Sequence, residues 1–225
     1  MKRNSSLFLW IAVLELFTLM ACNNKGSQKM EAQSVKAYDL NTDAAYEKAI
    51  FASGCFWCVE AVFESVTGVK EAISGYAGGT ANDAHYEIVS SGSTDHAESV
   101  LVIYDPAKVS YETLLKVFFG SHDATTLNRQ GPDAGRQYRS AIFYINDGQK
   151  LAANDYIKML YESGKYKGGS ITTQVAQLPA FYAAEDYHQD YEKKNPNQPY
   201  VRSVSIPRLN KFKAAYPELL KSKEH

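Results

Sequence analysis

The spacing of apolar and polar residues predicts a series of short strands and helices that begins near residue 46. Apolar runs that stop at glycine, proline or polar residues are typical of strands, and apolar residues three or four apart indicate helices. The predicted strands are 49–52, 69–76, 97–104, 140–145 and 171–178. One predicted helix ends at Gly68. Two longer ones run over 110–119 and 147–163, with Ser110 and Asp147 as their caps. Single helical turns are predicted at 86–89 and 183–188.

The order of these elements predicts an α+β fold. It runs β-α-β-β-α-β and then α-β, which fits a ferredoxin-like split βαβ two-layer sandwich with an additional strand and helix. After residue 179 the pattern becomes irregular, and prolines at 196, 199, 207 and 217 interrupt it. Because proline disrupts regular elements, we expect an irregular C-terminal segment that wraps over the surface.

The first 45 residues have a different pattern. Lys2 and Arg3 precede a mostly apolar run of about 14 residues, the length of a signal-peptide core rather than of a membrane-spanning helix. Cys22 follows Leu19-Met20-Ala21, a stretch that resembles the lipobox of bacterial lipoproteins. An uncleaved membrane anchor is the alternative. The predicted regions are a signal peptide (1–21), a polar tether that starts at a lipidated Cys22 (22–45), a folded domain (46–217) and a tail (218–225).

A lipoprotein of this kind would reside in the cell envelope, held at a membrane by its lipid and exposed to an oxidising compartment. The net charge of −1 gives no reason to expect nucleic-acid binding. We expect a monomer. Lipidation would remove the thiol of Cys22, so that Cys55 and Cys58 would remain as one pair among the three cysteines.

Cys55 and Cys58 lie where the first predicted strand turns into a helix. The backbone N–H groups in the first turn of a helix are unpaired and the helix dipole is positive there, which favours a thiolate at Cys55. Cys58 lies one turn further along the same face, so the pair can meet the Cα separation of ~4.4–6.8 Å that a disulfide requires. The pattern indicates a redox-active or nucleophilic cysteine.

Three other interpretations fit a Cys-x-x-Cys pair. One is half of a zinc site, but neither a second cysteine pair nor a His-x-x-x-His run accompanies it in the sequence. Another is a structural disulfide, although so short a loop stabilises little. The third is a thioredoxin-like carrier, which uses the same spacing at the same kind of junction. The spacing alone leaves carrier and enzyme open.

Glu98 stands at the start of the clearest predicted strand, 97–104. Its carboxylate either points to water from the edge of the sheet or is a partly buried acid with a raised pKa. The strand alone favours the exposed position. A long, polar, turn-rich loop follows at 120–136, and such loops more often carry function than packing.

Four stretches resemble the motifs of type A peptide methionine sulfoxide reductases and occur in the order of that family. They are Gly54-Cys55-Phe56-Trp57-Cys58-Val59-Glu60, Gly92-Ser93-Thr94-Asp95-His96-Ala97-Glu98, the loop 128–139 and Ala184-Glu185-Asp186-Tyr187-His188-Gln189. Many relatives carry resolving cysteines in a C-terminal tail, whereas no cysteine follows Cys58 here. The resemblance is therefore to the subgroup with GCFWC.

The resemblance implies a nucleophilic Cys55 and a resolving Cys58. The methyl group of the sulfoxide would lie against two aromatic residues, Phe56 and Trp57. Four polar residues would surround the sulfoxide oxygen or support those that do: Glu98 as the general acid, Tyr86, Tyr138 and Asp133.

The implied reaction needs no metal and no organic cofactor. Attack by Cys55 on the S epimer of methionine sulfoxide, free or in proteins, would release methionine and leave a sulfenic acid. Cys58 would condense with that sulfenic acid, and thioredoxin or a similar dithiol would reduce the disulfide. The alternative function is a Cys-x-x-Cys thiol–disulfide carrier lipoprotein, although the Trp-Cys-Gly-Pro-Cys motif of such carriers does not occur.

Overall fold

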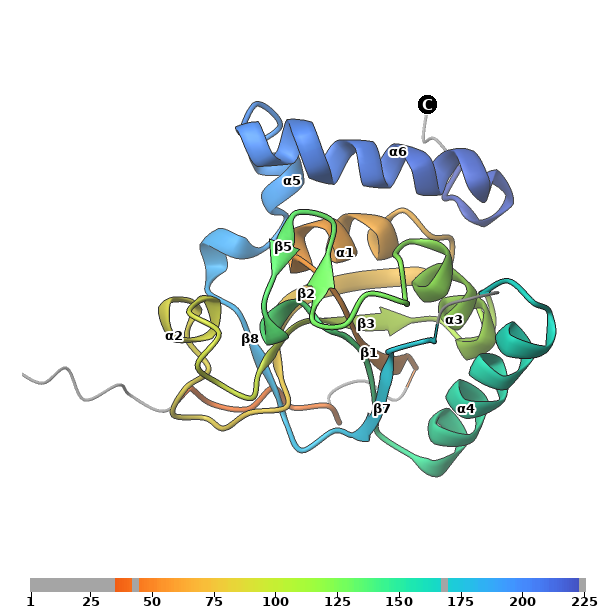
Figure 1. Ribbon diagram of the computed structural model, residues 1–225, viewed down its shortest axis with the longest axis horizontal. Helices are drawn as coiled ribbons and strands as arrows, with labels where there is room; N and C mark the ends of the chain where they lie inside the picture. The colour runs from red at the N-terminus through yellow and green to blue at the C-terminus, as the bar shows by residue number, and fades with distance from the viewer. Residues whose placement is uncertain (1–34, 42–44, 167–169, 223–225) are drawn as a thin grey trace, which may run out of the picture. The chain divides into compact units, whose positions relative to one another are not determined.

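A six-stranded sheet forms the centre of the folded domain (Figure 1). The computed structural model describes residues 35–41, 45–166 and 170–222, so the predicted signal peptide and Cys22 lie outside the described residues. The strands stand in the order β7-β6-β1-β3-β2-β8. Their bounds are β1 Glu47–Ser53, β2 Val69–Ala77, β3 Ala97–Tyr104, β6 Ser140–Tyr144, β7 Gln174–Gln177 and β8 Phe181–Ala183.

The four central strands confirm the predicted split βαβ arrangement. β1 pairs antiparallel with both β3 and β6, and β3 also pairs antiparallel with β2. Two edge strands extend this sheet: β7 runs parallel to β6, and β8 runs antiparallel to β2. β8 falls in the segment that was expected to be irregular, so the C-terminal part of the chain contributes to the sheet.

Three of the six helices in the described residues, α1, α3 and α4, pack against the sheet. The helix bounds are α1 Phe56–Glu64, α2 Tyr86–Ser90, α3 Tyr111–Gly120, α4 Asp147–Glu162, α5 Tyr191–Lys194 and α6 Ile206–Ala215. Phe51 of β1 stacks on Phe63 of α1 and Phe118 of α3, with ring centroids 5.0 and 5.2 Å apart. The alternating neighbours Ile50 and Ala52 pack into a second apolar cluster. Strand alternation therefore separates two cores, one of them beneath the helices.

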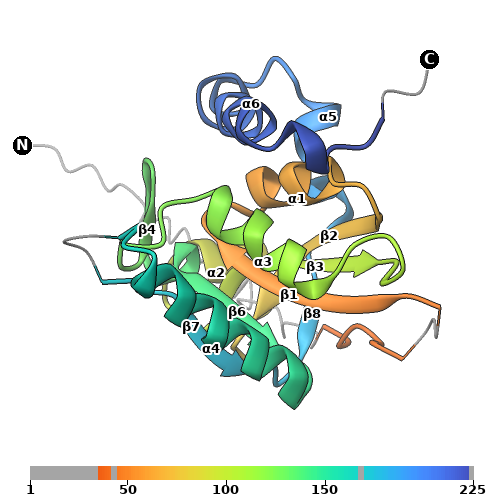
Figure 2. The ribbon, with the colours of Figure 1, turned by 90° about the vertical axis from the view of Figure 1, so that its right-hand side faces the viewer.

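The C-terminal segment wraps over α1, as expected, but it is more regular than the prolines suggested. In both ribbon views α6 lies on the outer side of α1 (Figures 1 and 2). A π-helical turn, Val201–Ser205, runs directly into α6. Pro207 lies where the π-helical turn passes into α6, and a proline at that point cannot donate a backbone hydrogen bond to the preceding turn. The chain nevertheless stays helical through this proline, and the wider turn before it is π-helical.

Two local predictions have different outcomes. Ser110 caps α3 as predicted, because its hydroxyl accepts a 3.2 Å bond from the N–H of Thr113. The predicted cap at Asp147 was wrong by one residue, since Asn146 accepts the N–H of Gln149 at 2.9 Å.

Part of the predicted polar tether packs on the domain. The N–H of Tyr38 donates to the carbonyl of Phe181 at 2.8 Å, and the two rings meet edge to face. Over residues 35–41 this segment is therefore held by contacts with the sheet. Within the described residues, no helix combines the length and the apolar character that crossing a bilayer requires.

Candidate active site

Antiparallel pairing brings the predicted site residues to one end of the sheet. Phe51 of β1 pairs with Val100 of β3, so Cys55, just beyond β1, lies beside Glu98 near the start of β3. Ser53 pairs with Ser140 of β6, which brings Tyr138 to the same end. Residues that are far apart in sequence therefore meet through strand register.

These residues surround a cavity of ≈ 230 Å³. Its walls come from the first turn of α1, the starts of α2 and β3, the loop before β6 and the segment before the π-helical turn. The lining residues are Cys55, Phe56, Trp57, Tyr86, Glu98, Asp133, Tyr138, Gln198 and Tyr200. The structure thus brings together every predicted site residue of the domain except Cys58, which lies behind Cys55.

The turn before Cys55 requires glycine. Gly54 has φ +93°, a conformation that residues with a side chain rarely adopt. A Cβ atom there would also lie 2.6 Å from Cβ of Gln130. Gln130 belongs to a two-strand hairpin, β4 Arg129–Gln130 and β5 Asp133–Ala134, within the long loop that was expected to carry function. The hairpin holds Asp133 at the cavity.

Both cysteines are free thiols and are buried, with Cys55 6 % exposed and Cys58 1 % exposed. Burial and the neighbouring Cys58 raise the pKa of Cys55. A hydrogen bond from Cys55, aided by the charge of Arg208, lowers the pKa of Cys58 to about 6. These opposite shifts favour the thiolate at Cys58 and the protonated form at Cys55.

This distribution of charge corrects the expectation of a resting thiolate at Cys55. The prediction relied on the unpaired N–H groups at the start of α1. In the structure the N–H of Phe56 donates instead to Oε2 of Glu98, at 3.0 Å. The helix start therefore stabilises a carboxyl group, and Cys55 has the Cys58 sulfur as its hydrogen-bond acceptor.

Glu98 is buried, so the exposed position that the strand favoured was wrong. Only 2 % of the residue is exposed, and burial raises the pKa of its carboxyl group to about 8. The negative charge of Asp133 contributes to the same shift. Near neutral pH most Glu98 carboxyl groups thus carry a proton, which an acid in this cavity can transfer.

Tyrosine hydroxyls complete the polar side of the cavity. Burial raises the pKa of Tyr86 to about 12 and also raises the pKa of Tyr138, so both hydroxyls stay neutral donors. Tyr200, which the sequence did not single out, donates its hydroxyl to Oδ2 of Asp133 at 2.5 Å. It follows Pro199 in a stretch without apolar periodicity, so no local pattern marked it.

The apolar wall is held from the C-terminal side. Trp57 stacks on Tyr191 of α5 with centroids 3.8 Å apart and an interplanar angle of 9°. Its indole Nε1 donates to Nδ1 of His188 at 3.1 Å. His188 also packs against the ring of Phe56 at 5.0 Å. These contacts fix the orientation of the two rings predicted to bind a methyl group.

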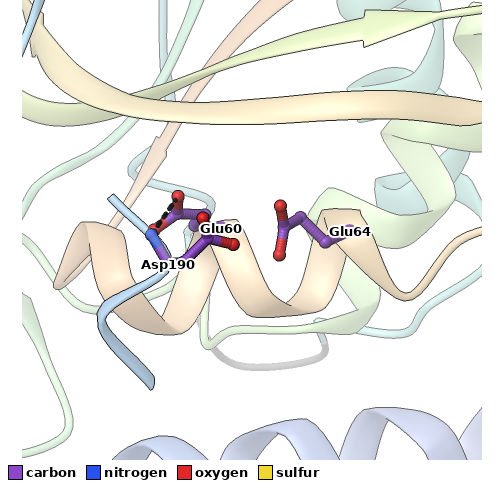
Figure 3. A group of neighbouring side chains, drawn as sticks. All are labelled: Glu60, Glu64 and Asp190. Carbon is purple, nitrogen blue, oxygen red and sulfur yellow. Dashed lines mark hydrogen bonds between the residues drawn. The ribbon is translucent and has the colours of Figure 1, made fainter. Parts of the chain in front are cut away.

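A second acidic group lies further along α1 (Figure 3). Glu60 and Glu64 of α1 and Asp190 bring one carboxylate oxygen each within 4.8 Å of one another. Glu60 accepts the N–H of Asp190 and the hydroxyl of Ser74, both at 2.9 Å. Lys193 pairs with Glu64 and with Asp190. These bonds fasten the segment around Asp190 to α1, and the lysine offsets part of the negative charge.

A cysteine pair beside a protonated carboxyl group supports transfer of oxygen or electrons through sulfur, so the fold and the cavity define a thiol-dependent oxidoreductase. Comparison with known proteins specifies the family. The family model of peptide methionine sulfoxide reductase matches residues 47–219. This chain belongs to the peptide methionine sulfoxide reductase family.

Individual relatives agree with this assignment. Peptide methionine sulfoxide reductase MsrA 2 of Synechocystis sp. is 54% identical over 177 residues, which cover 78% of this chain and 82% of the relative. The MsrA protein of Acinetobacter baumannii is 48% identical over 176 residues, covering 78% and 99%.

Solved structures show the same fold. Methionine sulfoxide reductase A of Corynebacterium diphtheriae matches with a TM-score of 0.66 and 30% identity, over 75% of this chain and 90% of that one. Mxr1 of Saccharomyces cerevisiae in reduced form matches with a TM-score of 0.63 and 34% identity, over 73% and 92%.

Proposed function

We propose that this member of the family reduces the S epimer of methionine sulfoxide, free or within proteins, through a sulfenic acid at Cys55 and a disulfide between Cys55 and Cys58. The single observation that carries this mechanism is the cavity in which Cys55 and the protonated Glu98 face the same small volume. A sulfoxide there meets a nucleophile at its sulfur and an acid at its oxygen.

The first half-reaction moves oxygen from one sulfur to another. Cys55 attacks the sulfoxide sulfur, Glu98 gives its proton to the oxygen, and Glu98 then takes up the proton that Cys55 loses. The hydroxyl group then moves to the Cys55 sulfur, and the bonds that join the methionine sulfur to the oxygen and to Cys55 both break. Methionine leaves and Cys55 is now a sulfenic acid, so the cysteine is oxidised by two electrons as the sulfoxide is reduced. Tyr86 and Tyr138 donate hydrogen bonds to the oxygen, while Phe56 and Trp57 contact the methyl group.

The second half-reaction restores the thiols. Cys58 attacks the sulfenic sulfur, the S–O bond breaks, and the oxygen leaves as water with the proton that Glu98 holds. Thioredoxin or a similar dithiol then reduces the disulfide and supplies the two protons that Cys55 and Glu98 regain. Because Cys58 lies one helical turn after Cys55, we assign this chain to the GCFWC subgroup.

Turnover of resolved epimers tests the activity. The purified protein with dithiothreitol should convert the S epimer of methionine sulfoxide to methionine and leave the R epimer, since one type of enzyme serves each epimer. Equal consumption of both epimers would contradict the assignment. Absence of methionine with either epimer would favour the thiol–disulfide carrier instead.

We also propose that the protein is a lipid-anchored monomer of the cell envelope. The support is in the sequence: the basic and apolar start, and Cys22 after Leu19-Met20-Ala21. Labelling of cells with palmitate, with a Cys22→Ala variant as the control, tests the anchor. The wild type should incorporate the label and the variant should not, and equal labelling would contradict lipidation. Sedimentation of the purified protein tests the monomer.

A further inference from the structure

The sulfur of Cys58 contacts a buried hydroxyl group. Oγ of Ser205 lies 2.8 Å from Sγ of Cys58. Ser205 is 0 % exposed, and Cys58 is almost as deeply buried. The two residues are 147 positions apart in sequence, so this contact exists only because the C-terminal segment crosses α1.

Ser205 lies in a segment that is anchored at the start of α6. It is the last residue of the π-helical turn Val201–Ser205 and directly precedes α6. Three residues later, Arg208 donates from Nε to the carbonyl of Ser121 at 2.8 Å and from Nη2 to Oγ of Ser53 at 3.1 Å. These bonds tie the start of α6 to the ends of α3 and β1, the strand that leads into Cys55.

The surroundings of Cys58 favour its charged form. The thiol of Cys55 donates to the Cys58 sulfur, and the guanidinium of Arg208 adds a positive charge nearby. A hydroxyl group that donates to a thiolate stabilises the charged form further. Hydrogen bonds from Ser205 and Tyr200 lower the pKa of Cys58 as well, while burial and the nearby carboxyl group of Glu192 oppose the charged form.

We propose that Ser205 is a positioning residue for disulfide formation: its hydroxyl donates to Cys58 and holds that sulfur as a thiolate oriented toward Cys55. This inference rests on the proposed function, because it concerns the second half-reaction. Cys58 uses an electron pair to form the S–S bond, the S–O bond of the sulfenic acid breaks, and hydroxide leaves as water with the proton from Glu98. Cys58 is oxidised and the sulfenic sulfur of Cys55 is reduced.

A matched pair of variants separates the role of the Ser205 hydroxyl from any effect of changing a serine in the π-helical turn. Ser205→Ala removes the buried hydroxyl, whereas Ser203→Ala makes the same change at an exposed position of the same π-helical turn. The full-length protein is mixed with S-epimer methionine sulfoxide without reductant. Methionine release reports the first half-reaction, and trapping of the sulfenic acid with a dimedone probe reports the second.

Ser205→Ala should release methionine at the wild-type rate but form the disulfide about 10- to 100-fold more slowly, as loss of one hydrogen bond to a charged group implies. The pH dependence of disulfide formation should also move to higher pH, because the Cys58 thiolate loses a donor. A purely structural role would not produce that shift. Ser203→Ala should match the wild type in both steps.

A second pair of variants tests the inference even if Ser205→Ala does not fold. Ser205→Thr and Ser205→Val add the same bulk, but only threonine keeps the hydroxyl, so the valine variant should form the disulfide more slowly than the threonine variant. Wild-type disulfide formation in Ser205→Ala, or equal rates in the threonine and valine variants, would overturn the inference. Failure of the wild type to release methionine would instead count against the proposed function.

Discussion

The backbone N–H of Phe56 donates a 3.0 Å hydrogen bond to Oε2 of Glu98, which joins the first turn of α1 to the start of β3. By itself this bond lowers the pKa of the carboxyl group, but burial outweighs it and the pKa is about 8. The bond therefore fixes the position of the acid without ionising it. Cys55, the residue before Phe56, is thereby placed next to a proton donor.

Replacement of Glu98 tests that acid. Glu98→Gln keeps the shape of the side chain but removes the transferable proton, so we expect methionine formation to fall ~10²–10⁴-fold, the usual contribution of general acid catalysis. The number of reactive thiols should not change. Glu87→Gln, at an exposed position of α2, is the matched control. Wild-type rates in Glu98→Gln over the whole pH range would remove Glu98 from the mechanism.

The pH dependence of the first half-reaction should reflect the same group. Because the acid form is active and the pKa is about 8, methionine release should stay constant below that pH and fall above it. The charge of Asp133 helps to raise this pKa, so Asp133→Asn should move the fall to lower pH. Asp95→Asn, at an exposed site, should leave the profile unchanged. An unmoved profile in Asp133→Asn would show that the two carboxyl groups do not interact.

Local patterns in the sequence predicted the parts of the site that depend on neighbouring residues. The junction at Cys55 follows from an apolar strand before a helical pattern, and the start of the strand at Ala97 was predicted at the observed residue. Burial of Glu98 did not follow, because all eight residues of β3 are buried. Because both faces of β3 are buried, the order of residues along the strand did not show whether the Glu98 side chain faces solvent or the core.

Other parts of the site depend on contacts between distant segments. Tyr200 binds Asp133, Ser205 contacts Cys58, and Arg208 ties the same segment to Ser53 and Ser121. No short-range pattern encodes such pairings. The expected Cys55 thiolate failed chiefly because burial and the neighbouring Cys58 raise the pKa of Cys55. The N–H of Phe56 has an acceptor 42 positions away, which the helix start alone could not reveal.

Glu60 should make the stability of the fold depend on pH. Burial raises its pKa from the usual 4.5 to about 7, so the folded state binds the proton more tightly than the unfolded state does. The free energy of unfolding should therefore decrease as pH rises from about 4.5 to 7, and the contribution of Glu60 should then level off. Glu60→Gln, which resembles the protonated form, should reduce this decrease.

Urea unfolding at several pH values measures the effect of Glu60. Glu71→Gln, at an exposed position of β2, serves as the control and should follow the wild type. If Glu60→Gln lost as much stability between pH 4.5 and 7 as the wild type does, the buried carboxyl group would not be a source of the dependence.

The most direct test of the mechanism is a single turnover without reductant in two cysteine variants. Cys58→Ser should release about one methionine per enzyme and then stop with a sulfenic acid at Cys55. It should not turn over with thioredoxin, although small thiols can restore it by attacking the sulfenic acid. Cys55→Ser should release no methionine. Methionine release by Cys55→Ser, or normal thioredoxin-dependent turnover by Cys58→Ser, would contradict the assigned roles of the pair.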